Sequence, residues 1–229
     1  MATTDPGLTT TTVPHLERIE VTAPPGTFAN PAPLGLLGYG MSTVLLSLSN
    51  AGLFDLGTMV LAMAVFFGGI AQLVVATLAF RRGETFAVTA FGGYAFLWLT
   101  FAFLLIGGQH GWWPTANSST AIGWYLMTWA VFSLGMMLAS MSAPRVLTWV
   151  LALTVALLAI LAVATWTGSE TLTKTGGWEG LLTGVAAMYT AFAFLINESL
   201  GRTILPVGAP LASPPAPAPL PPRQRDLPR

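Results

Sequence analysis

Residues 146–166 read VLTWVLALTVALLAILAVATW and contain no charged side chain. At about 1.5 Å of rise per residue, a helix of this length spans about 30 Å, which is the thickness of the hydrocarbon core of a bilayer. The stretch therefore predicts a helix that crosses a membrane.

Comparable apolar runs recur along the whole chain. Of the 229 residues, 54% are hydrophobic and 8% are charged, whereas a soluble domain carries about 25% charged residues. The short alternating segments of a transmembrane β-barrel are not found. The sequence predicts an all-α integral membrane protein in which each protomer has six transmembrane helices. We expect these helices at residues 34–53, 57–80, 86–107, 121–141, 146–166 and 178–196.

The basic residues predict the orientation of the helices. Six spans place both termini on one side, and that side carries Arg18, Arg81, Arg82, Arg145 and Arg202, together with the arginines of the last seven residues. Only Lys174 falls on the opposite side. Because cytoplasmic loops are enriched in Lys and Arg, we expect both termini to be cytoplasmic in a multi-pass protein of the cell membrane.

The two ends of the chain differ in composition from the apolar middle. Residues 1–29 have few large apolar side chains and lack the apolar core of a signal peptide, and residues 206–229 are rich in proline. We expect disordered cytoplasmic tails on either side of a membrane transport domain at residues 30–205.

Several kinds of chemistry are disfavoured. The chain has no cysteine, and His15 and His110 lie outside the apolar runs, so no metal site, cofactor or enzyme active site is expected. Nor is a nucleic-acid partner expected. Glu179 and Glu198 fall at opposite ends of the sixth predicted helix, which leaves no carboxylate near the centre of a span to relay protons.

The first helix begins with a motif, Asn30-Pro31-Ala32-Pro33-Leu34-Gly35-Leu36. Asn30 is a favourable N-cap and Pro31 suits the first helical position. A helix N-terminus offers unpaired N–H groups and a partial positive charge, which favour a small anion. The alternative is that the motif only caps the helix.

This motif resembles the signature of the acetate uptake transporter family, also called succinate–acetate permeases. Further similar segments, in register, are Gly68-Gly69-Ile70-Ala71-Gln72, Thr89-Ala90-Phe91, and Asn197-Glu198 followed by Gly201-Arg202-Thr203. The resemblance implies a homohexamer in which each six-helix protomer has its own pore. It also implies transport of acetate, and in some members of succinate, generally together with protons.

The resemblance further implies an apolar constriction formed by three side chains. An aromatic residue of helix one and a tyrosine of helix three correspond to Tyr39 and Tyr94. The third position, aliphatic in the family, falls on Thr154 in an ungapped alignment or on its neighbour Leu153. A threonine there would widen the constriction and make it more polar, which would admit larger or more hydrated carboxylates.

Substrate contacts are expected from Asn30, Pro31, Gly35, Asn50, Gln72 and Thr89. The amides of Asn50 and Gln72 lie in or near the membrane, where they need hydrogen-bond partners, and they would donate to a carboxylate in transit. The alternative for both is a hydrogen bond between helices.

A second group, at the end of the sixth helix, comprises Asn197, Glu198 and Arg202. These residues are candidates for gating or substrate exit, and the alternative is that Glu198 and Arg202 form a helix-stabilising pair. The spacing Gly180-x-x-x-Gly184 favours close helix packing.

The expected function is proton-linked uptake of acetate and related carboxylates. Protons would either follow an anion or cross on the substrate itself, whose pKa of about 4 to 5 resembles that of Glu. We expect uptake to rise as the external pH falls toward 5. The alternatives are a passive channel for small anions or neutral solutes, and an acetate sensor that does not transport.

Overall fold

The computed structural model describes residues 29–112 and 118–212, and all regular elements in these ranges are helices. They are α1 (Ala32–Asn50), α2 (Thr58–Met63), η1 (Ala64–Ala71), α3 (Gln72–Arg81), α4 (Thr85–Gln109), α5 (Ser119–Ala139), η2 (Ser140–Ser142), α6 (Arg145–Thr167) and α7 (Glu170–Ser199). The segments α2, η1 and α3 form one continuous span, and η2 extends α5, so six helices are long and apolar enough to cross a membrane. The predicted six-helix fold is confirmed.

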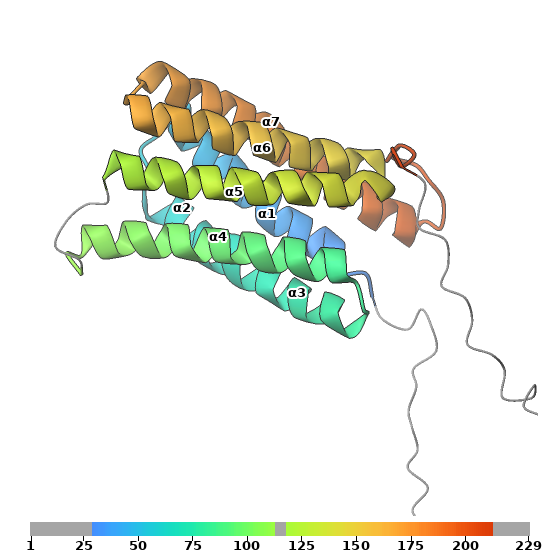
Figure 1. Cartoon of the computed structure of the whole chain (residues 1–229). Helices are drawn as coiled ribbons and strands as arrows, with labels where there is room; N and C mark the ends of the chain where they lie inside the picture. The colour runs from blue at the N-terminus through green and yellow to red at the C-terminus, as the bar shows by residue number, and fades with distance from the viewer. Residues whose placement is uncertain (1–28, 113–117, 213–229) are drawn as a thin grey trace, which may run out of the picture.

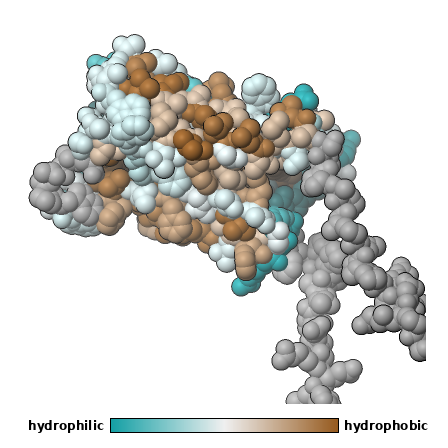
Figure 2. All heavy atoms as spheres, viewed as in Figure 1, coloured by the Kyte–Doolittle hydropathy of each residue, from teal (hydrophilic) through white to brown (hydrophobic). Residues whose placement is uncertain are grey.

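The helices lie side by side, and both ends of the described chain leave the same end of the bundle (Figure 1). On the face shown in Figure 2, hydrophobic residues occupy much of the middle of the bundle, and a group of hydrophilic residues lies at the end where the termini leave. Residues 1–28, with His15 and Arg18, and residues 213–229 lie outside the described ranges, so the predicted tails fall largely there.

The sixth span is longer than the sequence predicted. It begins at Glu170 and not at Trp178, because Gly168 ends α6 in the left-handed conformation and the Ser169 hydroxyl accepts a hydrogen bond from Leu172 N at 3.3 Å. Gly176 and Gly177, which suggested a loop, are buried inside the helix. Glu179 is therefore the tenth residue of α7, about 14 Å along the axis, and does not lie at its end.

The second span contains an unusual feature. Residues Ala64–Ala71 form a π-helix, η1, between the α-helical segments α2 and α3. Gly68 and Gly69 within it are buried, and a Cβ at Gly68 would lie 2.6 Å from the Trp98 ring. A π-helix often marks a functional position, and this one ends immediately before Gln72.

The closest packing joins α1 to α7. A Cβ at Gly184 would lie 2.8 Å from Gly40 O and 2.9 Å from Val44 N, so the two backbones touch where they cross. Gly180, one turn earlier, packs against Ser47 of α1. This geometry agrees with the packing role that the glycine spacing predicted.

The segment after α7 returns to the bundle. Val146 N donates to Val207 O at 3.1 Å, and the N–H groups of Leu211 and Ala212 donate to Met141 O at 2.9 and 2.8 Å. Residues 206–212, predicted as the start of the C-terminal tail, are thus held against the ends of α5 and α6.

Candidate transport pathway

Two internal chambers lie along the bundle. The larger, about 300 Å³, is lined by residues of α1, α4, α5 and α6 together with Leu56 and Thr173 of α7, and it reaches Asn50 and Thr165, at the end away from the termini. The smaller, about 110 Å³, reaches Ala32, Phe86 and Phe194, at the end where the termini lie. Because both chambers are lined by Tyr39 and Thr154, these side chains form the boundary between them.

This boundary is closed by aromatic and hydroxyl contacts. The rings of Tyr39 and Tyr94 have centroids 5.3 Å apart, and the Tyr39 hydroxyl lies 2.7 Å from Thr154 Oγ1. Tyr94 donates to Ser133 Oγ at 3.0 Å, and all four side chains are buried. We call Tyr39, Tyr94 and Thr154 the constriction.

The structure places Thr154, and not Leu153, between the chambers. Thr154 is 2% exposed and lines both, whereas Leu153 is half-buried and lines neither. The Thr154 hydroxyl also donates to Val150 O at 2.8 Å, which fixes its orientation on α6. The third side chain of the constriction is therefore polar.

Gln72 lines the smaller chamber and is fully buried. Its Nε2 donates to Gly68 O at 2.7 Å. Among the residues that the structure describes, Oε1 has no hydrogen-bond partner. An amide oxygen left unpaired in an apolar site is costly, which makes Gln72 a candidate to bind a molecule inside the chamber.

The other predicted substrate contacts differ in position. Asn50 is half-buried and lines the larger chamber. Thr89 lines neither chamber, because it lies on the exposed face of α4 and its hydroxyl donates to Thr85 O at 2.9 Å. The contact of Thr89 with the substrate stays a prediction, and the side of α4 that lines the smaller chamber carries Ala90 and Tyr94.

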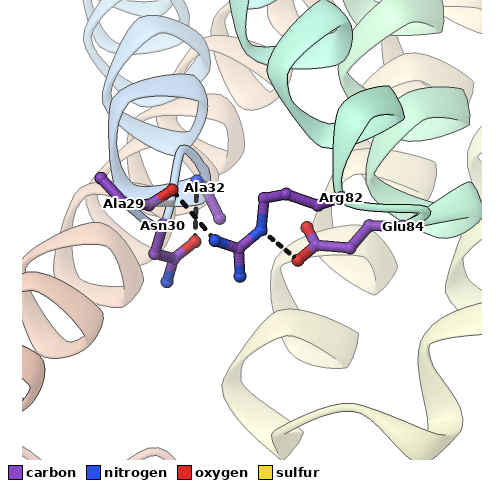
Figure 3. Close-up of polar contacts among 5 residues, drawn as sticks. All are labelled: Ala29, Asn30, Ala32, Arg82 and Glu84. Atoms are coloured by element: carbon purple, nitrogen blue, oxygen red, sulfur yellow. Dashed lines mark hydrogen bonds and ion pairs between the residues drawn. The ribbon is translucent and has the colours of Figure 1, made fainter. Parts of the chain in front are cut away.

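The signature motif lies at the mouth of the smaller chamber. Helix α1 begins at Ala32 with Pro31 as the N-cap residue, one position later than expected, and Asn30 Oδ1 accepts a hydrogen bond from Ala32 N at 3.0 Å. Beside it the Arg82 guanidinium donates to Ala29 O at 3.1 Å and pairs with Glu84 at 2.6 Å (Figure 3).

Gly35 has a packing role in the same motif. A Cβ on Gly35 would overlap the Phe91 ring, so glycine allows α1 to lie against this ring of the smaller chamber. Neither Asn30 nor Pro31 lines a chamber; both directly precede Ala32, which lines the smaller one.

The residues predicted for gating or exit hold the segment after α7. Asn197 Nδ2 donates to Leu205 O at 2.8 Å, and its Oδ1 accepts from Ile204 N and Leu205 N at 2.7 and 2.9 Å. Glu198 and Arg202 are exposed, and the ion pairs among the described residues do not join them. This arrangement favours a structural role for Asn197 over gating.

Sequence reasoning missed two polar residues beside the chambers. Ser133 of α5 accepts the Tyr94 hydroxyl, and Trp98 of α4 lines the larger chamber with its indole Nε1–H unpaired among the described residues. An isolated serine within an apolar span needs a partner, which is the signal that would have indicated Ser133.

Glu179 lies outside both chambers. Its side chain is half-buried, Oε1 accepts from Thr183 Oγ1 at 3.0 Å, and Oε2 is buried without a hydrogen-bond partner in the described part of the chain. The predicted helix start at Trp178 had placed this carboxylate at the end of the sixth span, whereas the structure places it at the tenth position of α7.

Comparison with known proteins identifies the family. Residues 15–209 match the GPR1/FUN34/yaaH family. The chain is 42% identical to the succinate-acetate/proton symporter SatP of Escherichia coli over 180 residues, which cover 79% of this chain and 95% of that protein. It is 30% identical to ammonia transport outward protein 2 of Saccharomyces cerevisiae, over 75% of this chain and 63% of the yeast protein.

A solved structure gives the same result. The structure of the bacterial acetate channel SatP is similar at a TM-score of 0.77 and 41% identity, over 79% of this chain and 99% of that one. The named relatives are transporters and channels, not enzymes. The chain is a multi-pass membrane protein that belongs to the GPR1/FUN34/yaaH family, and the predicted relationship to the acetate transporters is confirmed.

Proposed function

We propose that this protein transports acetate and other small carboxylates such as succinate through the two chambers and the constriction between them. The observation that carries the proposal is the pair of chambers that meet at Tyr39 and Thr154 inside a single protomer. The likeness to a protein named succinate-acetate/proton symporter and to a structure titled acetate channel supports the substrate class.

The chambers are of suitable size. An apolar cavity of about 150 Å³ binds benzene, which has six heavy atoms. The smaller chamber, about 110 Å³, is therefore large enough for acetate, which has four. Passage requires the Tyr39–Thr154 hydrogen bond to open, and a hydrogen bond within a membrane contributes only about 0.6 to 2 kcal/mol. The constriction can therefore open and close thermally.

We further propose proton-linked uptake in a homohexamer of the cell membrane with both termini cytoplasmic. The arginine distribution supports the orientation. Apolar side chains exposed on the outside of the protomer, such as Phe66, Val131 and Trp149, suit contact with lipid or neighbouring subunits. In this proposal Glu198→Gln leaves the rise of uptake at low pH unchanged, because Glu198 is exposed and far from the constriction.

Labelled acetate uptake into liposomes tests the proposal. A secondary carrier gives saturable uptake and counterflow, in which unlabelled acetate inside accelerates entry of the label, and a protonophore collapses its accumulation. A passive channel for small anions or neutral solutes gives uptake without counterflow. A sensor binds labelled acetate in detergent but gives no uptake above that of protein-free liposomes, and that result would refute transport.

A further inference from the structure

We infer that Lys174 captures the carboxylate of the substrate at the mouth of the larger chamber, where this carboxylate takes the place of Glu170 in an ion pair. The inference rests on the proposed transport of small carboxylates and names a residue that acts before the substrate enters the chamber. It follows from the position of Lys174, from the exposure of its ion pair and from the distribution of charge between the two ends of the bundle.

Lys174 lies at the rim of the larger chamber. It is the fifth residue of α7 and directly follows Thr173, which lines this chamber. Its Cε lies close to Gly52, since a Cβ built on Gly52 would be 3.4 Å from it. Gly52 comes two residues after Asn50, which lines the chamber from the end of α1. The lysine side chain is therefore placed where α1 and α7 meet at the mouth, at the end of the bundle away from the termini (Figure 1).

The ammonium group of Lys174 has an exchangeable partner. It lies 2.6 Å from Glu170 Oε1, and the two side chains are 51% and 80% exposed. An exposed ion pair with this i, i+4 spacing contributes little to stability, because water solvates both charges when the pair separates. A dissolved carboxylate carries the same charged group as Glu170. It can therefore replace this glutamate at the ammonium group.

Charge is divided unequally between the two ends of the bundle. Among residues 29–112 and 118–212, Lys174 is the one Lys or Arg at the end away from the termini, and the other end carries Arg81, Arg82, Arg145 and Arg202. The end with Lys174 also carries Asp55, an exposed residue that directly precedes Leu56 of the chamber lining. The carboxylates of Asp55 and Glu170 repel an approaching anion, so attraction toward this mouth must come from Lys174.

The chamber itself does not supply this attraction. In the described part of the chain, the residues that line it include no Lys, Arg, His, Asp or Glu. A charge at the rim acts on dissolved ions over about 8 Å at physiological ionic strength, and it raises their local concentration. Because an exposed ion pair is weak, a carboxylate held by Lys174 remains free to move on into the chamber.

Acetate uptake by variants of Lys174 tests the inference. Each protein is reconstituted into phosphatidylcholine liposomes, and protease access to an affinity tag added after Arg229 measures the fraction in which the mouth of the larger chamber faces outward. Lys174→Gln should raise the half-saturating concentration of external acetate about fivefold, which is the effect of one unit charge about 4 Å away in water. Lys174→Arg keeps the charge and should leave that concentration within about twofold of the native value.

Glu170→Gln separates capture of the substrate from stabilisation of the helix. Lys174→Gln and Glu170→Gln break the same ion pair, so a purely structural role predicts that both variants change uptake in the same direction. Under the inference, Glu170→Gln should instead lower the half-saturating concentration of acetate, because Lys174 loses the glutamate that competes with the substrate. Shifts of both variants in one direction, or no shift in either, would overturn the inference.

Salt and lipid composition show which anion Lys174 binds. The difference between the native protein and Lys174→Gln should disappear in about 1 M potassium chloride, where the screening length is about 3 Å. A difference of unchanged size in that salt would contradict an electrostatic capture. A difference that appears only in liposomes that contain phosphatidylglycerol would show that Lys174 binds an anionic lipid and not the substrate.

Arg81→Gln is the matched control. It removes one exposed positive charge at the opposite end of the bundle and should leave the half-saturating concentration of external acetate unchanged. A rise as large as that of Lys174→Gln would show that the net charge of the protein, and not Lys174, governs capture. Absence of protein-dependent influx in the native protein would refute the proposed function, whereas native influx with equal half-saturation in every variant would refute this inference alone.

Discussion

Replacing Ala90 by phenylalanine should block transport by filling the smaller chamber. Ala90 is 7% exposed, lines this chamber, and packs in a cluster with Tyr39, Tyr94 and Leu151. A benzene ring occupies a cavity of about 150 Å³. The chamber has about 110 Å³, so the ring overfills it and leaves no passage. Overpacking a core typically costs about 1 to 3 kcal/mol, which a membrane bundle of this size should tolerate.

Acetate counterflow and thermal unfolding in detergent measure the two effects separately. We expect counterflow of Ala90→Phe to fall to the level of protein-free liposomes while a cooperative unfolding transition remains. Val131→Phe adds the same ring to a residue that is 63% exposed on α5 and should keep full counterflow. Full counterflow in a folded Ala90→Phe protein would show that the substrate does not pass through the smaller chamber.

Three further substitutions test other parts of the account. Gly184→Val places a side chain against the Gly40 backbone and should lower the unfolding temperature in detergent. Gly135→Ala is the control, because a Cβ there has no neighbour within 4 Å, and it should not lower the unfolding temperature. Trp98→Phe removes the unpaired N–H of the larger chamber and should raise the half-saturating acetate concentration about tenfold; an unchanged value would remove Trp98 from the site. Thr154→Leu makes the constriction narrower and less polar, so competition assays should show succinate losing more uptake than acetate, and equal losses would contradict this.

Most of the fold could be predicted from the sequence because a bilayer imposes a fixed length on each helix. The apolar run at residues 146–166 differs from α6 (Arg145–Thr167) by one residue at each end. The sixth span was predicted too short because Gly176 and Gly177 were taken as loop residues. In the structure they allow α7 to approach Ile160 and Leu161 of α6 and the end of α1, a tertiary contact that local composition does not reveal.

The site was predictable only in part. Tyr39, Tyr94 and Gln72, the residues that the motifs suggested, line the chambers. The choice between Leu153 and Thr154 depended on which of two adjacent residues faces inward, and that is fixed by the rotation of α6 within the bundle. Thr89 and Asn197 share motifs with pathway residues, yet one faces outward and the other caps a turn, because a motif fixes order along the chain and not direction in space.

A single cysteine at the constriction tests the central claim most directly, because the native chain has no cysteine that would interfere. Thr154→Cys should react in liposomes with a small methanethiosulfonate reagent, and this reaction should abolish labelled acetate uptake. Excess acetate should slow the reaction of the cysteine with the reagent. Leu153→Cys, which faces neither chamber, should lack this protection by acetate. Modification of Thr154→Cys that leaves uptake unchanged would contradict the claim that substrate passes between Tyr39, Tyr94 and Thr154.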